Sequence, residues 1–177
     1  MVLSNVDIIN RINLEENDPK RLVISNFNEK ALQPASYDIT LGNSFKILES
    51  KQVLNINTNS KYKNVTRDSY ILYPKKFVLA TTREFISIPL DLVAIIDGRS
   101  SYGRMGIDIQ NAGWIDPGFK GELTLEIRNE SSCPVMLNSG TRIGQLVFLE
   151  LLTPASYGYN GKYYNQTGAT GMNADRE

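Results

Sequence analysis

The chain contains no histidine and only one cysteine, Cys133, among its 177 residues. Without histidine it cannot form a Ser–His or Cys–His catalytic pair, and a zinc site built from His and Cys ligands is excluded as well. Any acid–base chemistry must therefore use carboxylates, lysine, tyrosine or water. A single cysteine also excludes an internal disulfide and suits a reducing compartment, so we expect a cytoplasmic protein.

Excess charge and long apolar runs are absent too. The 19 Lys and Arg residues balance the 19 Asp and Glu residues, which argues against a nucleic-acid partner attracted by bulk charge. No apolar run approaches the ~20 residues of a membrane span, and no basic segment followed by an apolar one indicates a secretory signal. We therefore expect one ordinary globular domain with neither a membrane nor a nucleic-acid partner.

Glycine is scarce in the first half of the chain. Only Gly42 lies before residue 97, and the other glycines fall between Gly98 and Gly171. Tight turns and close backbone approaches are therefore concentrated in the second half, where we expect the functional site.

Short apolar segments separated by turn residues predict a mainly β fold. A short helix is expected after Ser4, a candidate N-cap with Asp7 three residues later. Segment 55–68 is polar and is expected to form a loop or an exposed hairpin. Strands are predicted at 21–24, 37–41, 45–48, 70–73, 77–80, 85–88, 92–96, 123–127 and 145–152.

Many short strands and little helix favour an all-β barrel or jelly roll over an α/β fold. From Pro154 onward, Gly, Tyr, Asn and Thr dominate, and this composition is too polar to build a core. We therefore predict a β-barrel domain over residues 1–153 and a flexible C-terminal tail over residues 154–177.

Segment 98–104 carries two arginines, two serines and two glycines directly after an apolar strand. Guanidinium groups and the backbone N–H groups of a turn suit a polyphosphate. The alternative is a helix with an N-cap at Ser100 or Ser101 and arginines that face solvent. Composition alone favours neither interpretation.

Strand 123–127 places its apolar residues on one face, so Glu126 points to the other face. The simpler interpretation is a solvated outer face on which Glu126 lies beside an exposed Arg128. The alternative is a face that lines a pocket, at a subunit junction, where a partly buried glutamate shuttles protons. The residues of the strand alone favour the simpler interpretation.

Three further segments have both a structural and a functional interpretation. Trp114 lies beside an Asp-Pro-Gly turn, and an aromatic packed over a β-turn is the simpler explanation. Gln145 can donate to and accept from a base edge, or it can satisfy neighbouring backbone. The tail segment 159–168 can close over a nucleotide or remain a mobile terminus.

Together these segments resemble the dCTP deaminase branch of the dUTPase-like superfamily. The resemblance covers nearly the whole chain, and its motifs follow the family's order at 33–38, 98–101, 112–119, 124–126, 142–146 and 161–163. It implies a distorted β-barrel or jelly roll and a homotrimer whose sites are shared between subunits. It also implies zinc-free hydrolysis of the 4-amino group of dCTP to dUTP and ammonia, in pyrimidine deoxynucleotide metabolism.

By its position in the matching motif, Glu126 corresponds to the family's catalytic glutamate, and the resemblance implies the same role for it. This residue would take a proton from the water that attacks C4 of cytosine and then deliver a proton to ammonia. Ser100 and Arg104 match residues that organise the water and the ring, and Asp116 matches the residue that contacts the 3′-hydroxyl. The implied nucleotide-binding positions are Arg99, Ser100, Ser101, Tyr102, Gly103, Arg104, Ala112, Asp116, Thr124, Leu125, Glu126, Gln145, Tyr159, Lys162 and Gln166.

The resemblance also bears on ligands other than the substrate. Magnesium would lie mainly on the triphosphate oxygens and on water molecules, as Mg²⁺ usually does. The family makes dTTP a candidate inhibitor.

The pair Gly113-Trp114 bears on the product. Family members that stop at dUTP tend to carry His-Arg here, whereas bifunctional members carry Gly and an aromatic residue. The resemblance therefore implies a bifunctional enzyme in which water next attacks the α-phosphorus to give dUMP, a precursor of dTTP, and diphosphate. As a hypothesis, Asp116 helps to position that second water.

Three alternatives stay open: a monofunctional deaminase that releases dUTP, a plain dUTPase, and a non-enzymatic, nucleotide-binding trimeric regulator. Plain dUTPases usually carry an apolar residue in place of Glu126 and a Tyr in place of Phe119. These two positions favour a deaminase.

Overall fold

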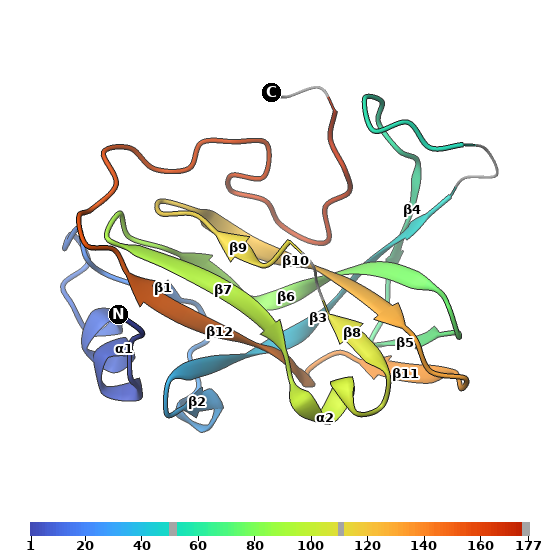
Figure 1. Ribbon diagram of the computed structural model, residues 1–177, viewed down its shortest axis with the longest axis horizontal. Coiled ribbons are helices and arrows are strands. Elements are labelled where there is room, and N and C mark those ends of the chain that lie inside the picture. The colour runs from blue at the N-terminus through green and yellow to red at the C-terminus, as the bar shows by residue number, and fades with distance from the viewer. Residues whose placement is uncertain (50–52, 110–111, 175–177) are drawn as a thin grey trace.

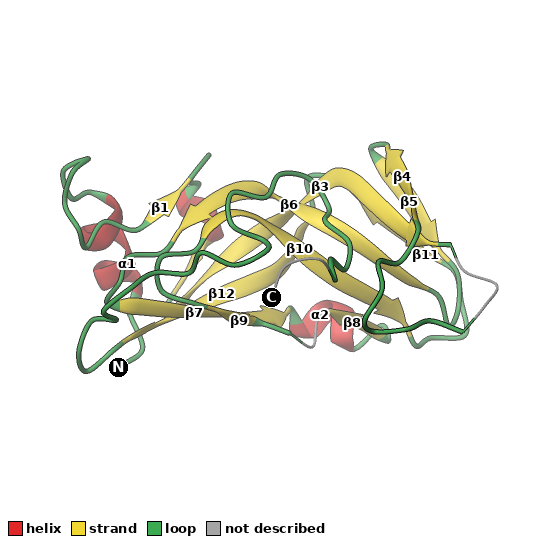
Figure 2. Cartoon of the chain, turned by 90° about the horizontal axis from the view of Figure 1, so that it is seen from above, coloured by secondary structure: helices red, strands yellow, loops and turns green. Residues whose placement is uncertain are grey.

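The computed structural model describes residues 1–49, 53–109 and 112–174. The chain folds mainly into strands that form one strongly curled antiparallel sheet, with a short helix at its N-terminal end (Figure 1). Viewed from above, the sheet forms an open trough rather than two flat layers (Figure 2). The predicted all-β class with a short N-terminal helix is confirmed.

The elements follow the chain in this order: α1 (Asn5–Ile12), β1 (Val23–Ile24), the 3-10 turn Glu29–Ala31, β2 (Leu32–Gln33), β3 (Ser36–Leu48), β4 (Tyr62–Thr66), β5 (Ser69–Leu72), β6 (Phe77–Ser87), β7 (Leu92–Gly98), α2 (Ser100–Gly103), β8 (Ile107–Ile109), β9 (Trp114–Ile115), β10 (Lys120–Asn129), β11 (Val135–Asn138) and β12 (Arg142–Glu150). The main sheet runs β8-β10-β6-β3-β12-β7-β9, with β1 added to β6 and with β2 and β4 added to β3. Strands β5 and β11 pair separately.

Helix α1 begins as the sequence predicts. Ser4 Oγ accepts the N–H of Asp7, and Asp7 Oδ2 accepts the N–H of Ser4, which completes a capping box. In the last turn, Arg11 pairs with the buried Asp91 and with Glu150 at the end of β12. These ion pairs fix the helix against the end of the sheet.

The core lies inside the curl of the sheet. Its largest fully buried side chains include Tyr37 and Phe45 of β3 and Phe148 of β12, two strands that are distant in sequence. Strand β10 alternates as predicted, with the side chains of 123, 125 and 127 buried and those of 124 and 126 half-buried. One face of β10 therefore belongs to the core, and the other is available for a site.

Two pairs of predicted strands are single long strands. Segments 37–41 and 45–48 both belong to β3, and segment 77–80 and all of segment 85–88 except Ile88 belong to β6. The strand predicted at 37–41 does not end at Gly42, which lies inside β3: a Cβ there would lie 2.5 Å from Thr81 Cγ2, and the β3–β6 register shifts between Leu41 and Phe45. The glycine therefore marks a close approach at a bulge. Segment 55–68, expected to form a loop or an exposed hairpin, contains the strand β4, which pairs with β3 and not within the segment.

Helix α2 differs from the expected N-cap. Its cap is Arg99, which makes no side-chain capping hydrogen bond, so neither Ser100 nor Ser101 caps the helix. With one turn of helix only, both serine side chains remain at the surface and line a cavity described below.

The segment that follows β12 runs back over β9 and β10 (Figure 1). Backbone N–H groups of Ala155 and Tyr159 donate to the carbonyls of Leu90 and Pro117, each at 2.8 Å. Further on, Gln166 forms a parallel bridge with Gly121 of β10. None of the helices within the described residues is long and apolar enough to cross a membrane.

Candidate active site

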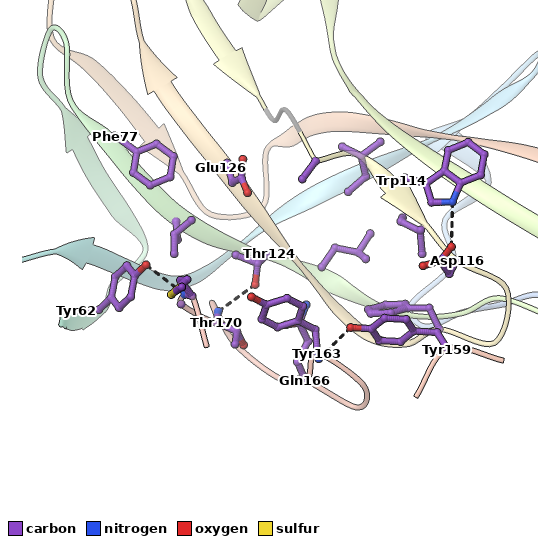
Figure 3. A pocket seen from close by; sticks show the side chains of 18 residues that line it. Tyr62, Phe77, Trp114, Asp116, Thr124, Glu126, Tyr159, Tyr163, Gln166 and Thr170 are labelled. Carbon is purple, nitrogen blue, oxygen red and sulfur yellow. Dashed lines mark hydrogen bonds between the residues drawn. The ribbon is translucent and has the colours of Figure 1, made fainter. Parts of the chain in front are cut away.

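A cavity of about 520 Å³ lies between the outer face of β10, strand β9 and the C-terminal segment (Figure 3). Its volume falls within the range of small-molecule sites. The lining is mixed apolar and polar, and it consists of Tyr62, Phe77, Leu79, Ile96, Ala112, Trp114, Ile115, Asp116, Phe119, Leu123, Thr124, Glu126, Tyr159, Tyr163, Gln166, Thr170, Gly171 and Met172. Most of these residues come from the second half of the chain, as the distribution of glycine predicts.

Glu126 lines this cavity. It lies opposite Leu79 in the β10–β6 ladder, and its side chain is half-buried. Arg128, two residues further along the same face, is exposed and does not line the cavity. The simpler interpretation, a solvated outer face, therefore holds for Arg128 and is wrong for Glu126. Leu125 is fully buried on the core side, so only its backbone is available to a ligand.

Asp116 lies in the same cavity, well apart from Glu126 (Figure 3). Trp114 Nε1 donates a hydrogen bond to Asp116 Oδ1 at 3.0 Å. The predicted turn is present, with Phe119 N–H donating to Asp116 O, but Trp114 is 58% exposed rather than packed over it. Phe119 is the buried aromatic of this segment. The two cavity carboxylates thus have different surroundings.

The C-terminal segment forms the wall that faces β10. Gln166 Nε2 donates to the carbonyl of Glu122 at 2.8 Å, and Thr170 N–H donates to Thr124 Oγ1 at 3.0 Å. The ring of Tyr159 lies 5.8 Å from that of Phe119 between centroids. Lys162 does not line the cavity; its Nζ donates to the carbonyl of Asn173.

A second cavity, of about 560 Å³, lies on another part of the molecule, where β2, β3, β7 and β12 meet. Its lining is strongly polar and comprises Gln33, Pro34, Ala35, Ser36, Asp38, Asp97, Gly98, Arg99, Ser100, Ser101 and Gln145. Four of the predicted nucleotide-binding residues lie here: Arg99, Ser100, Ser101 and Gln145. Two guanidinium groups reach this region, because Arg99 and Arg142 both pair with Asp38.

The three residues predicted to be catalytic are not brought together within one chain. Glu126 lines the first cavity and Ser100 lines the second, while Arg104 is exposed at the end of α2 and lines neither. Tyr102 is partly buried against the core, and Gly103 is exposed beside it. Ala112, Asp116, Thr124, Tyr159 and Gln166 do join Glu126 in the first cavity, and Gly113 directly precedes its Trp114.

Sequence patterns missed several residues of the first cavity. Tyr62 lies in a segment predicted only as a polar hairpin, yet its hydroxyl accepts the N–H of Met172 at 3.2 Å. Phe77 and Thr170 also line the cavity and had no assigned role. No local signal indicates these positions, because they meet only when the C-terminal segment docks against β4 and β10.

Glu84 of β6 is a buried carboxyl that belongs to neither cavity. Burial raises its pKa above the ordinary value, and a hydrogen bond from the N–H of Thr40 at 2.9 Å opposes that effect in part. Within residues 1–49, 53–109 and 112–174, no three His, Cys, Asp or Glu side chains are grouped to hold a metal ion.

Comparison with solved structures defines the class of fold. The chain is similar to a 2′-deoxycytidine 5′-triphosphate deaminase from Agrobacterium tumefaciens, with a TM-score of 0.64 at 21% identity over 83% of this chain and 47% of that one. It is also similar to a mutant dUTPase of phage phi11 of S. aureus, described with a coordinated structural Mg(II) ion, with a TM-score of 0.51 at 19% identity over 78% and 96% of the two chains. The fold is therefore dUTPase-like.

Comparison of sequences then defines the family. A family model described as dCTP deaminase-like matches residues 2–151, and the chain belongs to this family. A curated relative from Persephonella marina, named dCTP deaminase, dUMP-forming, is 44% identical over 86% of this chain and 88% of its own. Another, from Haloarcula marismortui and named dCTP deaminase, is 40% identical over 100% and 97%. The resemblance inferred from the motifs is confirmed.

Proposed function

We propose that the chain is a zinc-free dCTP deaminase that continues to dUMP. In the first reaction dCTP and water give dUTP and ammonia, and in the second dUTP and water give dUMP and diphosphate. The observation that carries the proposal is the position of Glu126, a half-buried carboxylate on the wall of a nucleotide-sized cavity. The names of the curated relatives support the same activity.

Glu126 acts as the proton shuttle at cytosine C4. Its carboxylate accepts a proton from water as the water oxygen adds to C4, and the carboxylic acid then protonates the amino group. Ammonia leaves as the C4 carbonyl forms, the proton of the C4 hydroxyl passes to N3 of the ring, and Glu126 is ionised again. No histidine exists in the chain to share this role. Asp116, at the other side of the cavity, is left to contact the deoxyribose.

The complete site is composite and lies between protomers of a homotrimer. The carboxylate and the Arg99–Arg104 region line different parts of one chain, so a nucleotide that contacts both must lie between two copies. Ser100 and Arg104 of one protomer then face the Glu126 cavity of its partner and hold the water and the triphosphate.

The second reaction is proposed from Gly113-Trp114 and from the dUMP-forming name of the Persephonella marina relative. Magnesium reaches this site on the triphosphate, where it neutralises phosphate charge. The phosphate contacts of this chain come from Arg99 and its neighbouring backbone.

The test is product analysis from dCTP with Mg²⁺. Ammonia together with dUMP and diphosphate is the expected result. Release of dUTP alone would make the enzyme monofunctional and overturn the second reaction. Cleavage of dUTP without any attack on dCTP would identify a plain dUTPase, and tight dCTP or dTTP binding without turnover would identify a regulator. Either of these last two results overturns the deaminase assignment.

A further inference from the structure

Arg99 in the second cavity is held by a buried carboxylate. The side chain of Asp38 is only 2% exposed, and its Oδ2 lies 3.5 Å from Arg99 Nε and 3.3 Å from Arg142 Nη1. Asp38 belongs to β3, where it pairs with Gln145 of β12 in the sheet. One acid on a rigid, buried strand is thus shared by two guanidinium groups at the wall of the cavity.

The surrounding hydrogen bonds orient Arg99 further. Its Nη1 donates to the carbonyl of Arg142 at 3.2 Å, while Arg142 itself is anchored by donating to the carbonyl of Lys30 at 2.7 Å. A guanidinium has five N–H donors, so engaging Nε and one Nη1 hydrogen leaves roughly three for another acceptor. Arg99 lines the cavity, and its side chain is 30% exposed.

Charge in this region favours an anion beside Arg99. One carboxylate, that of Asp38, pairs with two guanidinium groups, so Asp38, Arg99 and Arg142 together carry a net charge of +1. Asp97 also lines the cavity, but it is exposed to water and its Oδ1 accepts the N–H of Gly98 at 2.8 Å. The oriented and only partly exposed guanidinium is therefore the group best placed to bind phosphate oxygens.

We propose that Asp38 is a positioning residue that aims Arg99 at the polyphosphate of the nucleotide. The assignment of that ligand rests on the proposed function, whereas the orientation of Arg99 by Asp38 does not. A purely structural Asp38 would affect stability alone, since breaking a buried ion pair destabilises the fold. A positioning Asp38 also sets the affinity for phosphate groups, and it does so only through Arg99.

The experiment compares the wild-type protein with Asp38→Asn, Arg99→Gln and the double variant. The measurements are the Kd of inorganic tripolyphosphate, the KM and kcat for dCTP, and the Tm. We expect Asp38→Asn to raise the Kd and the KM by about tenfold and to change kcat by less than about twofold, because a neutral amide no longer forms the ion pair that holds Arg99. In the Arg99→Gln background, Asp38→Asn should have no further effect on the Kd.

Glu84→Gln is the matched control, because Glu84 is an equally buried carboxyl that lines neither cavity. It should leave the tripolyphosphate Kd unchanged. If Asp38→Asn does not fold, the pair Asp38→Asn/Arg142→Gln removes one charge of each sign. Measured against Arg142→Gln alone, the pair should show the same loss of affinity.

A lower Tm with an unchanged tripolyphosphate Kd would overturn the positioning role, as would equal effects of Asp38→Asn with and without Arg99. Failure of the wild-type protein to bind tripolyphosphate would overturn it too. If the wild-type protein releases no ammonia from dCTP, the proposed function fails instead, and the tripolyphosphate measurements still decide the role of Asp38.

Discussion

The carboxylate of Glu122 accepts the backbone N–H of Gly168 at 2.6 Å. The same oxygen accepts the hydroxyl of Thr81 at 3.2 Å, and the neighbouring Gly121 bridges to Gln166. Glu122 therefore ties the C-terminal segment to β10, four residues before Glu126. The attachment point of the C-terminal segment and the proposed proton shuttle therefore lie on the same strand.

Glu122→Gln should loosen this attachment. A charge-assisted hydrogen bond becomes a neutral one, which costs about 1 kcal/mol. We expect faster amide hydrogen exchange over residues 166–170 and a KM for dCTP about fivefold higher, because binding must then order a looser segment. Glu130→Gln is the control, since Glu130 pairs with Lys75 and does not contact the C-terminal segment. Unchanged exchange over 166–170 in Glu122→Gln would show that the attachment does not depend on the charge.

Local patterns predicted the elements whose causes are local. The start of α1 follows from Ser4 and Asp7 alone, and the two faces of β10 follow from simple alternation. The continuity of β3 and β6 was missed because it depends on their pairing with each other. Gly42, a strand end by composition, is a close approach that exists only when Thr81 lies opposite.

The same distinction applies to the candidate site. The resemblance placed Glu126, Asp116 and Gln166 in one site, and the fold brings them to one cavity. Tyr62 was missed because its contact with Met172 joins segments 110 residues apart. Ser100 and Glu126 line different cavities of one chain, and one chain's sequence does not specify which surfaces of two copies would meet.

Glu84 provides a prediction about pH. Its folded pKa lies above the unfolded value of about 4.5 because burial disfavours the carboxylate. The protonated side chain is therefore favoured by folding, and its contribution to stability is lost as pH rises from about 4.5 through the folded pKa. Glu84→Gln removes this loss while its amide oxygen can still accept the N–H of Thr40.

We expect the free energy of unfolding of Glu84→Gln, relative to wild type, to rise with pH above 4.5 and then level off. A tenfold difference in proton affinity between the folded and unfolded states corresponds to about 1.4 kcal/mol. Urea denaturation at several pH values between 4.5 and 8 measures the effect. Parallel curves for the two proteins would mean that Glu84 has the same pKa in both states.

Glu126→Gln tests the proton shuttle. The variant should fold and bind dCTP, yet release ammonia at least about 100-fold more slowly, because general acid–base catalysis contributes at least that factor. Arg128→Gln, on the same face but exposed outside the cavity, is the matched control and should keep normal activity. Ammonia release by Glu126→Gln at the wild-type rate would contradict the proposed role of Glu126 as the proton shuttle.

Mixed trimers test the composite site. Glu126→Gln and Ser100→Ala protomers should each be inactive alone. After they are dissociated and reassembled in equal amounts, about a quarter of the sites would combine an intact Glu126 with an intact Ser100 from its neighbour. Recovered ammonia release near that fraction is the expected result. No recovery in trimers that have demonstrably exchanged subunits would place both residues in the same protomer's site, against their separation in the fold.

Trp114 is predicted to influence the product type through its hydrogen bond to Asp116. The swap of Gly113-Trp114 to His-Arg, suggested by the family pattern, is predicted to keep deamination and suppress diphosphate release. In this fold, however, a Cβ at Gly113 would lie 2.6 Å from the carbonyl oxygen of Ile96, which itself belongs to the cavity wall. The double swap would therefore disturb the backbone at Gly113 as well as replace the side chain at position 114. Single substitutions of Trp114 change the side chain alone and are the better test.

Trp114→Phe keeps an aromatic ring but removes the N–H that donates to Asp116, and Trp114→Arg introduces the residue of the dUTP-releasing relatives. If the indole N–H holds Asp116 for the second water, Trp114→Phe should lower diphosphate release about tenfold, the effect of losing a hydrogen bond to a charged acceptor. Trp114→Arg, the residue of the family pattern for dUTP release, should lower it as well. Ammonia release should be unchanged, so dUTP should accumulate in quenched reactions that start from dCTP. Equal losses of ammonia and diphosphate would instead mean that Trp114 supports nucleotide binding common to both steps, and Gly113-Trp114 would then not account for a dUMP-forming enzyme.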